Sequence, residues 1–468
     1  MRLGNDLTIC RIQNAAAADP GPLVLKIDTT NTEGGSTASD TFKLALQNVG
    51  TYNFDIDWGD DTTSTITAYN DANLTHTYST GGEYIVKVNI NDGTFGGANG
   101  GTLRVNNLAS NDRLKYVEVQ QWGEYMTWYE ISQAFYGCSN MDITATDSLI
   151  MYGTTASNNS MGYAFAGCSS LTILPKIDWT NQRGSIADAS YMFSNCTSLT
   201  DISEFNSRVQ GYTPSGSVNC IGLFYNSGIV TLPSSFDTTN LGGIGFWCYN
   251  CSNLETVEAL DFSSGTVNTN INCAAAYQNC TSLTSYQITD HTGIDQSMSS
   301  FFYNCTSLTY SSFAGTLTLG ATTNINSMFR NTGLEQIPLA SLPAGVTNLR
   351  STFRDCSSLN VLPSFSTSNI TNFESAFQNC TSANSLAWDT LDWSAMTNGT
   401  NCFNGVTIDT SVYDDLLVEL DTNNANTGVT FHGGNSLYTK SPSAAETARS
   451  NLLARVPAWS ITDGGPTP

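Results

Sequence analysis

Apolar and polar positions repeat along most of the chain in a template of seven residues. The template begins with an aromatic residue, passes through a small polar residue and a cysteine, and ends on leucine after hydroxyl residues. The clearest copies are Phe193–Leu199, Phe302–Leu308 and Phe353–Leu359, and others begin at Phe135, Phe165, Phe224, Cys248, Tyr277, Phe329, Phe377 and Phe403. Their start-to-start spacings of 24 to 31 residues predict a solenoid, in which stacked units bury their apolar faces against one another.

The third template position predicts where each unit turns. It is Asn, Gly or Asp in all eleven copies, and these three types tolerate left-handed backbone best. Segments just before the aromatic residue, such as 189–192 and 325–328, suggest one short helical turn. Each unit is therefore expected to hold a short strand and a turn or 3₁₀ piece. Stacked at about 4.8 Å, eleven units would form an array roughly 50 Å long.

The fourth template position is Cys in eight copies. Free cysteine is among the most buried residue types, so these thiols are expected to form an internal ladder, which favours assembly in a reducing compartment. Scattered disulfides among Cys220, Cys273, Cys402 and the others are the alternative. No zinc site is expected, because matching pairs of CxxC motifs are absent from the sequence. The copies at Phe224 and Phe329 lack the Cys and share a one-residue deletion beside a glycine.

Residues 22–101 show short β-branched and aromatic runs separated by turn residues, which predicts a β-sandwich. The expected strands are Leu23–Ile27, Thr41–Leu46, Tyr52–Trp58, Ser64–Ala68 and Tyr84–Ile90. Residues 1–21 are expected to be an N-terminal arm and linker.

Two resemblances to known families follow from these motifs. The run F-x-N-C-[ST]-S-L-T-x-L-P resembles the BspA-like leucine-rich repeats of bacterial surface proteins, a family also found in mycoplasmas, anaerobic protozoa and marine phages. The segments 57–61, 76–78 and 82–86 resemble the signature of PKD (polycystic kidney disease) domains, which are Ig-like, although Asp61 replaces the usual glycine. BspA-like members of known role are mostly adhesins, and PKD domains are usually spacers or adhesion modules. The resemblances therefore imply binding and not catalysis.

The expected fold class is mainly β: a PKD-like sandwich at 22–101, a leucine-rich-repeat solenoid at 102–407 and a cap at 408–468. The resemblance implies a cap formed by a helix and a final strand. The helix is expected to start near Ser441 with Pro442 at its first position.

Charge and hydropathy exclude several partners. The chain has 17 Lys and Arg against 40 Asp and Glu, giving a net charge of −23, which disfavours nucleic acid and anionic membrane surfaces. No apolar run approaches the roughly 20 residues that span a bilayer, so no membrane insertion is expected. The N-terminus lacks the apolar segment of a secretory signal, so we expect either a removed signal or assembly into a particle.

Candidate chemistry is sparse. Three histidines stand apart from any nucleophile or metal motif, and we expect no enzyme activity, no catalytic residue, no cofactor and no metal. A structural hydrogen bond is the expected role of His76. Asp55, Asp57, Asp60 and Asp61 fit turn chemistry, and a calcium site is the alternative.

Aromatic side chains are the candidate binding residues, because they can stack on sugars or anchor a protein. Tyr136, Tyr225 and Tyr303 follow core aromatics and should face outward. The other candidates, Trp122, Tyr125 and Trp128, crowd the start of the solenoid. For this second group the alternative is a hydrophobic N-terminal cap.

These features predict a surface-exposed recognition or adhesion protein, extracellular or on a cell or virion surface, that binds a host-surface glycan or protein. A phage fibre or capsid-decorating protein is the preferred form, with the arm at 1–21 contacting other virion or surface-assembly proteins. One alternative is a structural subunit of an external filament or shell that mainly self-associates. An acidic polysaccharide-active enzyme is a third, and it would need two carboxylates that converge in a cleft.

Overall fold

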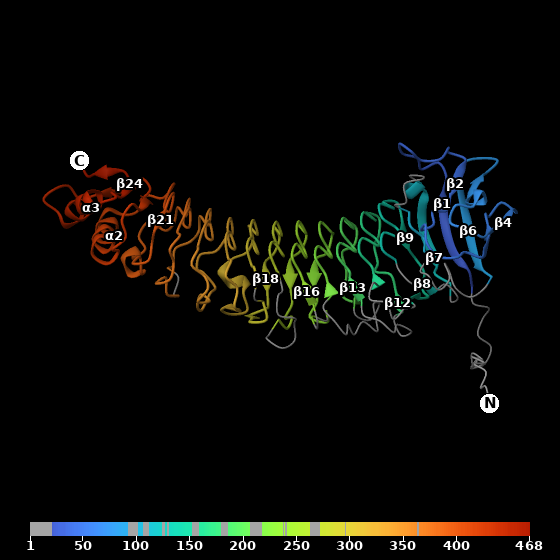
Figure 1. Ribbon diagram of the computed structural model, residues 1–468, viewed down its shortest axis with the longest axis horizontal. Coiled ribbons are helices and arrows are strands. Elements are labelled where there is room, and N and C mark those ends of the chain that lie inside the picture. The colour runs from blue at the N-terminus through green and yellow to red at the C-terminus, as the bar shows by residue number, and fades with distance from the viewer. Residues whose placement is uncertain are drawn as a thin grey trace, which may run out of the picture.

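The computed structural model shows a bowed, elongated molecule with a β-rich domain at one end, a solenoid in the middle and a helical cap at the other end (Figure 1). The structure describes residues 21–91, 102–105, 112–123, 127–128, 131–151, 159–178, 186–205, 218–236, 238, 241–262, 272–294, 296–362 and 365–468. The fold is mainly β, as the sequence predicts. Eleven coils of the solenoid carry the repeat template.

The N-terminal domain alternates buried and accessible side chains along its strands. In β1, for example, Leu23, Leu25 and Ile27 are fully buried. Strands β4, β3, β6 and β1 form antiparallel pairs in one sheet, and β2 pairs antiparallel with β5 in another. Each of the five strands predicted here overlaps an observed one. The elements are β1 (Leu23–Asp28), β2 (Thr41–Lys43), β3 (Phe54–Asp57), β4 (Thr63–Ile66), η1 (Ala72–Leu74), β5 (Thr75–Thr77) and β6 (Glu83–Ile90).

The motif residues of this domain make structural contacts. His76 Nε2 lies 2.8 Å from Asp60 Oδ2, and its ring stacks on Trp58 at 4.9 Å between centroids, so the expected structural hydrogen bond of His76 is confirmed. Asp57 accepts a hydrogen bond from the backbone N–H of Gly59, as turn chemistry predicts. Within the described ranges, no three His, Cys, Asp or Glu residues are placed to hold a metal ion.

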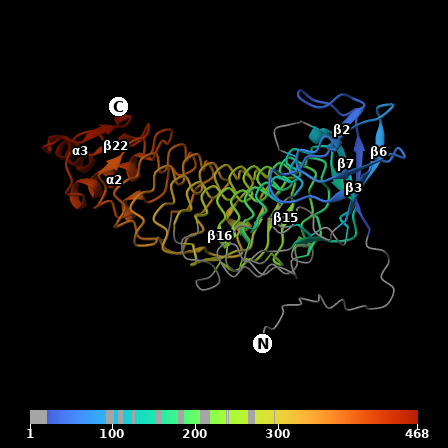
Figure 2. The same cartoon turned by 45° about the vertical axis from the view of Figure 1, so that its right-hand side comes forward.

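A single sheet joins this domain to the solenoid. The free edge of β1 pairs antiparallel with β7 (Tyr116–Gln121), and β7 pairs parallel with β9 (Asp142–Ile143), giving the order β4-β3-β6-β1-β7-β9. The first coils therefore extend the sheet of the N-terminal domain (Figures 1 and 2). The boundary expected between residues 101 and 102 stays a prediction, because 92–101 lie outside the described residues.

A buried ion pair fastens the same junction. Lys115, in η3 (Asp112–Lys115), is fully buried, and its Nζ lies 3.6 Å from Asp112 Oδ1. Nζ also donates to the carbonyl oxygen of Thr41 at 2.7 Å, and Asp112 accepts from the N–H groups of Thr37 and Lys43. Burial lowers the pKa of Lys115. Because a buried pair is tolerated only when its remaining hydrogen-bonding groups are satisfied, these contacts hold the loop before β2 against the solenoid.

Short parallel strands connect successive coils. They form the sets β8-β10-β12, β11-β13-β14-β16, β15-β17-β18 and β19-β20. Their bounds are β8 (Thr127–Trp128), β10 (Leu149–Met151), β11 (Asn159–Ser160), β12 (Ile177–Asp178), β13 (Ile186–Asp188), β14 (Val218–Asn219), β15 (Thr231–Leu232), β16 (Leu241–Gly243), β17 (Thr256–Val257), β18 (Ser285–Tyr286), β19 (Asp290–His291) and β20 (Thr318–Leu319), with 3₁₀ turns η4 (Tyr310–Ser312) and η5 (Trp388–Thr390).

The first template residue of each coil forms a column in the core, as predicted. Phe135 and Phe165 stack with ring centroids 5.6 Å apart, and the column continues through Phe193 at 5.7 Å. It is interrupted at Cys248, whose neighbour Trp247 is fully buried and packs 5.1 Å from Phe236. The larger ring beside Cys248 thus fills volume that the smaller side chain leaves.

Two residues in each coil have positive φ. One is the third template position in all eleven coils, which confirms the turns predicted there: Gly137, Gly167, Asn195, Asn226, Asn250, Asn279, Asn304, Asn331, Asp355, Asn379 and Gly405. The other lies two residues before the core aromatic. The helical turn expected before that aromatic is wrong, because Tyr191 and Ser327 have φ of 54° and 58°, outside the right-handed helical region.

Side-chain amides at the third position link neighbouring coils. Asn304 Nδ2 donates to Asn279 Oδ1 at 3.0 Å, and Asn331 Nδ2 donates to Asn304 Oδ1 at 2.6 Å. Similar bonds join Asn226 to Asn195, Asn279 to Asn250, and Asn379 to Asp355. Asparagine therefore has two functions here, since it accepts the left-handed backbone and ties one coil to the next.

The cysteines line the interior. All twelve described cysteines are buried, and none of these twelve forms a disulfide. Seven of the template thiols donate to the carbonyl oxygen of the first template residue in the preceding coil, at 3.0–3.2 Å. In the two shortened copies Ser227 and Thr332 take the place of Cys. A Cβ on the following Gly228 would lie 2.1 Å from the carbonyl oxygen of Thr197, so glycine is required where the deletion presses two coils together.

The C-terminal cap has two helices, whereas one was expected. The unexpected helix is α2 (Thr410–Asn423), which buries Tyr413, Leu416, Leu417 and Leu420. The predicted helix start was wrong by a few residues: α3 (Ala444–Ala454) begins after Ser443, whose hydroxyl accepts from the N–H of Glu446, so Pro442 precedes the cap residue.

Strands of the cap cover the last coil. The parallel strands β21 (Asn398–Gly399), β22 (Thr430–His432) and β24 (Ser460–Thr462) continue the stack, as expected of a final strand. β23 (Leu437–Tyr438) pairs with β25 (Gly465–Pro466). No helix in the described ranges is both long and apolar enough to span a bilayer.

Candidate functional site

Large side chains outside the core occupy two positions of the repeat. These positions are the second template position and the residue two before the core aromatic, which we call the outer position. In the first five coils these positions hold six aromatic residues. Tyr163 and Phe246 are exposed, and Tyr136, Tyr191, Tyr225 and Tyr249 are half-buried. In later coils they hold mainly Ser, Gln and Asn, with Tyr303, Arg330 and Arg354. One face of the solenoid is therefore aromatic near the N-terminal domain and polar farther away.

Five tyrosines on this face form a continuous row. The successive centroid distances are 6.2 Å for Tyr136–Tyr163, 5.1 Å for Tyr163–Tyr191, 6.0 Å for Tyr191–Tyr225 and 4.9 Å for Tyr225–Tyr249. The second and fourth pairs are nearly parallel, at 12° and 6°, and the other two are tilted by 59° and 55°. The tyrosine row thus supplies one ring per coil over five coils.

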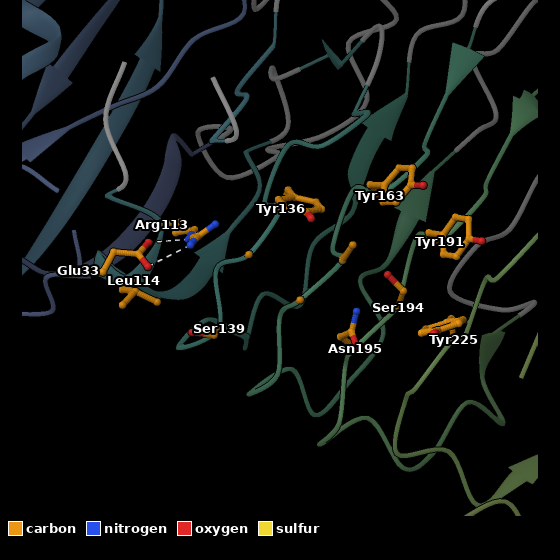
Figure 3. Close-up of a pocket in the computed structure, with 13 residues that line it drawn as sticks. Glu33, Arg113, Leu114, Tyr136, Ser139, Tyr163, Tyr191, Ser194, Asn195 and Tyr225 are labelled. Atoms are coloured by element: carbon orange, nitrogen blue, oxygen red, sulfur yellow. Dashed lines mark hydrogen bonds and ion pairs between the residues drawn. The ribbon is translucent and has the colours of Figure 1, made fainter. Parts of the chain in front are cut away.

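A groove of about 460 Å³ lies beside the first four of these rings. Figure 3 shows Tyr136, Tyr163, Tyr191 and Tyr225 along it, with Ser194 and Asn195 on the adjacent strip of backbone. The remaining lining residues near the tyrosines are small: Gly137, Ser139, Ala166 and Gly167. The groove exists because two consecutive coils place Ala166 and Ser194 where other coils carry tyrosine, arginine or glutamine.

Glycines fix the shape of the groove. Gly167 lies against the preceding coil so closely that an added Cβ would be 3.2 Å from the Cα of Gly137. A Cβ on Gly137 would lie 2.9 Å from the Cδ of Arg113. Both glycines have φ near 80°, so they combine the required left-handed backbone with the absence of a side chain.

An ion pair forms one end of the groove. Arg113 Nη2 donates to Glu33 Oε2 at 3.0 Å and Nε donates to Oε1, a bidentate arrangement. Glu33 lies in the loop between β1 and β2, and Arg113 lies in η3 (Figure 3). The two side chains keep 25% and 35% of their surface exposed. Their hydrogen bond raises the pKa of Arg113, so the guanidinium stays charged.

The hydroxyls of Tyr163 and Tyr191 are neutral at physiological pH, because the pKa of each is raised. Partial burial, followed by Asp188 and Tyr136, raises the pKa of Tyr163 above its usual value. Partial burial, followed by the phenols of Tyr163 and Tyr225, raises the pKa of Tyr191. A neutral phenol both donates and accepts a hydrogen bond. The groove therefore combines apolar rings with hydroxyl and amide groups, and charge is confined to its end.

The six predicted binding residues differ in location and in burial. Tyr136 and Tyr225 line the groove, and Tyr303 lies on the same face in a later coil, with the guanidinium carbon of Arg330 5.0 Å from its ring centroid. The prediction that Trp122 and Trp128 bind a ligand is wrong, because both side chains are fully buried, with ring centroids 6.3 Å apart. They belong to the hydrophobic cap that was the alternative.

Tyr125 lies outside the described residues. Tyr163 and Tyr191 were not among the predicted binding residues, because the prediction rested on the position after the core aromatic. Aromatic residues two positions before the core aromatic in the sequence are the signal that identifies both. Nothing in the sequence indicated that Glu33 would meet Arg113 at 80 residues' separation.

Comparison with known proteins supports the repeat assignment. Residues 129–213 and 161–309 match the family described as "BspA type Leucine rich repeat region", with six copies. Residues 296–413 match the family described as "Mycoplasma protein of unknown function, DUF285". The repeats of the solenoid are thus similar to BspA-type leucine-rich repeats, as the sequence motif indicated.

No curated protein matches the chain. Among solved structures, the crystal structure of the mouse RP105/MD-1 complex is similar at 12% identity and a TM-score of 0.22, covering 73% of this chain. The match spans 59% of that protein's chain.

Proposed function

We propose that this chain is a surface-exposed recognition protein whose groove beside the tyrosine row binds a glycan on a cell surface. The main support for glycan binding is the tyrosine row, which places one ring per coil next to a groove lined by small residues. BspA-type leucine-rich repeats suggest surface recognition or adhesion, and proteins that contain them are typically surface-located or extracellular. Solenoids of this class are typically non-enzymatic.

A repeating ligand suits this surface better than an irregular one. Sugar rings have an apolar face of C–H groups, which packs on an aromatic ring, and a rim of hydroxyls, which bonds to polar groups. The tyrosines recur at 4.9–6.2 Å and carry their own hydroxyls. Such a regular series is complementary to a polymer that presents the same group again and again, whereas a protein surface has no such period.

The groove offers little for hydrolysis. A glycosidase of the common kind uses two carboxyl groups that flank the scissile bond. Among the described residues that line this groove, Glu33 is the one carboxylate, and both its oxygens already accept from Arg113. These contacts favour binding over an acidic polysaccharide-active enzyme.

The proposed setting is a virion, where the chain would serve as a fibre or capsid-decorating protein. The twelve described cysteines, which are buried and form no disulfide, support folding in a reducing compartment, which suits a particle assembled inside a cell. We further propose that residues 22–101 are a PKD-like, Ig-like spacer, and that the arm at 1–21 contacts other proteins of the particle. Immunogold labelling with antibodies against the N-terminal domain tests this setting. Labelled virus particles are expected, and labelling confined to cell envelopes would contradict it.

The proposed binding is tested by adding the fluorescently labelled protein to a panel of cells, with and without periodate oxidation of surface glycans. Saturable binding that periodate abolishes is expected. Saturable binding that survives periodate but is lost on protease treatment of the cells would instead identify a protein ligand. Self-association without any cell binding would favour the structural subunit of a filament or shell.

A further inference from the structure

We infer that the groove recognises the terminal unit of a glycan chain, and that the N-terminal domain supplies part of this site through Glu33. This inference rests on the proposed glycan binding and adds the part of the polymer that is bound. It rests on a difference between the two ends of the groove. The Glu33–Arg113 pair and the N-terminal domain lie at one end, and the open face of the solenoid lies at the other.

One end of the groove meets the N-terminal domain. Past Tyr136 the lining residues are Leu114, Arg113 and Glu33 (Figure 3). Arg113 and Leu114 lie in η3, which immediately precedes β7, and β7 pairs with β1 of the N-terminal domain. At the other end the row continues from Tyr225 to Tyr249 on the open face of the solenoid. A linear polymer that lies along the row therefore meets the Glu33–Arg113 pair at one end and the open solenoid face at the other.

The end of the groove at the Glu33–Arg113 pair carries groups suited to a sugar terminus. Two nitrogens of Arg113 bond to Glu33, and its Nη1 lies over Gly137, 3.2 Å from where a Cβ would be. A carboxylate oxygen retains further acceptor capacity when it accepts one bond. The pair therefore presents an acceptor and a donor side by side, an arrangement that matches two neighbouring hydroxyls of a terminal sugar. Internal units of a linear chain have fewer free hydroxyls.

The pair is held in a fixed position. Arg113 packs on Gly137, and its helix neighbours Asp112 and Lys115 are buried in the junction with the loop before β2. The strand pairing of β1 with β7 holds the two parts of the chain together independently of the ion pair. Removing the charge of Glu33 should therefore leave the fold intact, since an exposed ion pair contributes little to stability.

The test compares polysaccharides before and after partial hydrolysis. Soluble mannan, laminarin, dextran and alginate, each intact and cut into fragments, are used to displace the labelled protein from cells that it binds. Terminal recognition predicts that inhibition is constant per mole of chain ends, so hydrolysis increases the potency per unit mass. Inhibition that is constant per unit mass would overturn terminal recognition and leave the proposed glycan binding standing. If periodate-sensitive cell binding is absent, the proposed function itself is overturned.

A variant pair tests the role of Glu33 directly. Glu33→Gln should weaken binding of the fragments about tenfold, because one charge-assisted hydrogen bond to a hydroxyl is lost. Glu374→Gln is the matched control, since Glu374 forms a similar exposed pair with Arg350 at 3.4 Å, far from the groove. Equal affinity of both variants, with circular dichroism unchanged, would overturn the inference.

Discussion

The ring of Tyr191 lies across Gly222, so closely that a Cβ at Gly222 would be 2.3 Å from the ring carbon Cε1. Gly222 occupies the outer position of its coil and has a φ of 63°. The coil that follows Tyr191 therefore makes room for the ring that lines the groove. The glycine at position 222 in one coil therefore determines where the Tyr191 ring of the preceding coil can lie in the groove.

Gly222→Ala should displace Tyr191 and weaken glycan binding. The left-handed backbone alone is tolerated at this position, because Ala275 has a φ of 57° in an equivalent place. Stability is expected to fall by only about 1–2 kcal/mol. Titration calorimetry and urea unfolding of the same preparation give both quantities. An alanine variant that binds as tightly as the native protein would show that Tyr191 does not need its observed position.

Asn304 is predicted to stabilise the solenoid through its backbone conformation and its amide. Asn304→Ala loses the bonds to Asn279 and Asn331 and places alanine at a φ of 63°, so a loss of about 2 kcal/mol is expected. Asn304→Gly keeps the left-handed backbone and should lose about half as much. Urea unfolding measures both changes. Asn360→Ala, at an exposed position outside the amide series, is the control; equal effects of all three substitutions would contradict the assignment.

The buried thiols predict alkaline instability. Burial raises the pKa of Cys356 to about 11 and that of Cys220 to about 12, whereas a thiol in the unfolded chain titrates near about 8.5. Above that pH the unfolded chain binds fewer protons than the folded protein, so stability should fall as pH rises from about 8.5 towards the folded pKa values. Urea midpoints measured across this interval test the direction. Midpoints that do not change, or that increase, would contradict it.

Thiol labelling separates this effect from that of other groups that titrate at high pH. Because the twelve described cysteines are buried, a maleimide should label none of them in the folded protein. All should be labelled in urea, as counted by mass spectrometry. Labelling of Cys305 in the folded state would show that the interior ladder is accessible.

His291 predicts a loss of stability in mild acid. The side chain is fully buried, its Nε2 lies 2.8 Å from the Tyr286 hydroxyl, and burial lowers its pKa to about 4. The unfolded chain binds a proton near about pH 6.5, so the stability that neutral His291 provides is present above that pH and is lost as pH falls towards 4. The difference in urea midpoint between the native protein and His291→Gln should shrink from pH 7 to pH 5. A difference that stays constant would contradict the prediction, and His432→Gln serves as the partly exposed control.

The sequence predicted the repeat and one of its two turns, for a local reason. Asn, Gly and Asp have an intrinsic tolerance for left-handed backbone, so their recurrence marked the third template position. The second turn has no such signature, because Tyr163 and Tyr191 occupy it as readily as serine does. It is imposed by the next coil, whose carbonyl groups accept from both N–H groups at 2.9 Å. Tertiary contacts of this kind have no signal in a single segment.

The candidate site was predictable in part for the same reason. Tyr136 and Tyr225 followed from their place after a core aromatic, whereas Trp122 and Trp128 were assigned to binding because aromatic composition does not distinguish a core from a surface. The contribution of Glu33 depends on β1 pairing with β7, which joins segments far apart in the chain. Pairing between distant strands could not be inferred from the local pattern.

The most direct test of the central claim is the affinity of the Tyr163→Ala/Tyr191→Ala double variant for the glycan or cell surface that the native protein binds. Tyr310→Ala is the matched control, because Tyr310 is similarly exposed at 37% but lies away from the groove. The account predicts that the double variant binds at least about tenfold more weakly, while the control binds normally and both remain folded. Unchanged affinity of a folded double variant would contradict glycan recognition by the tyrosine row.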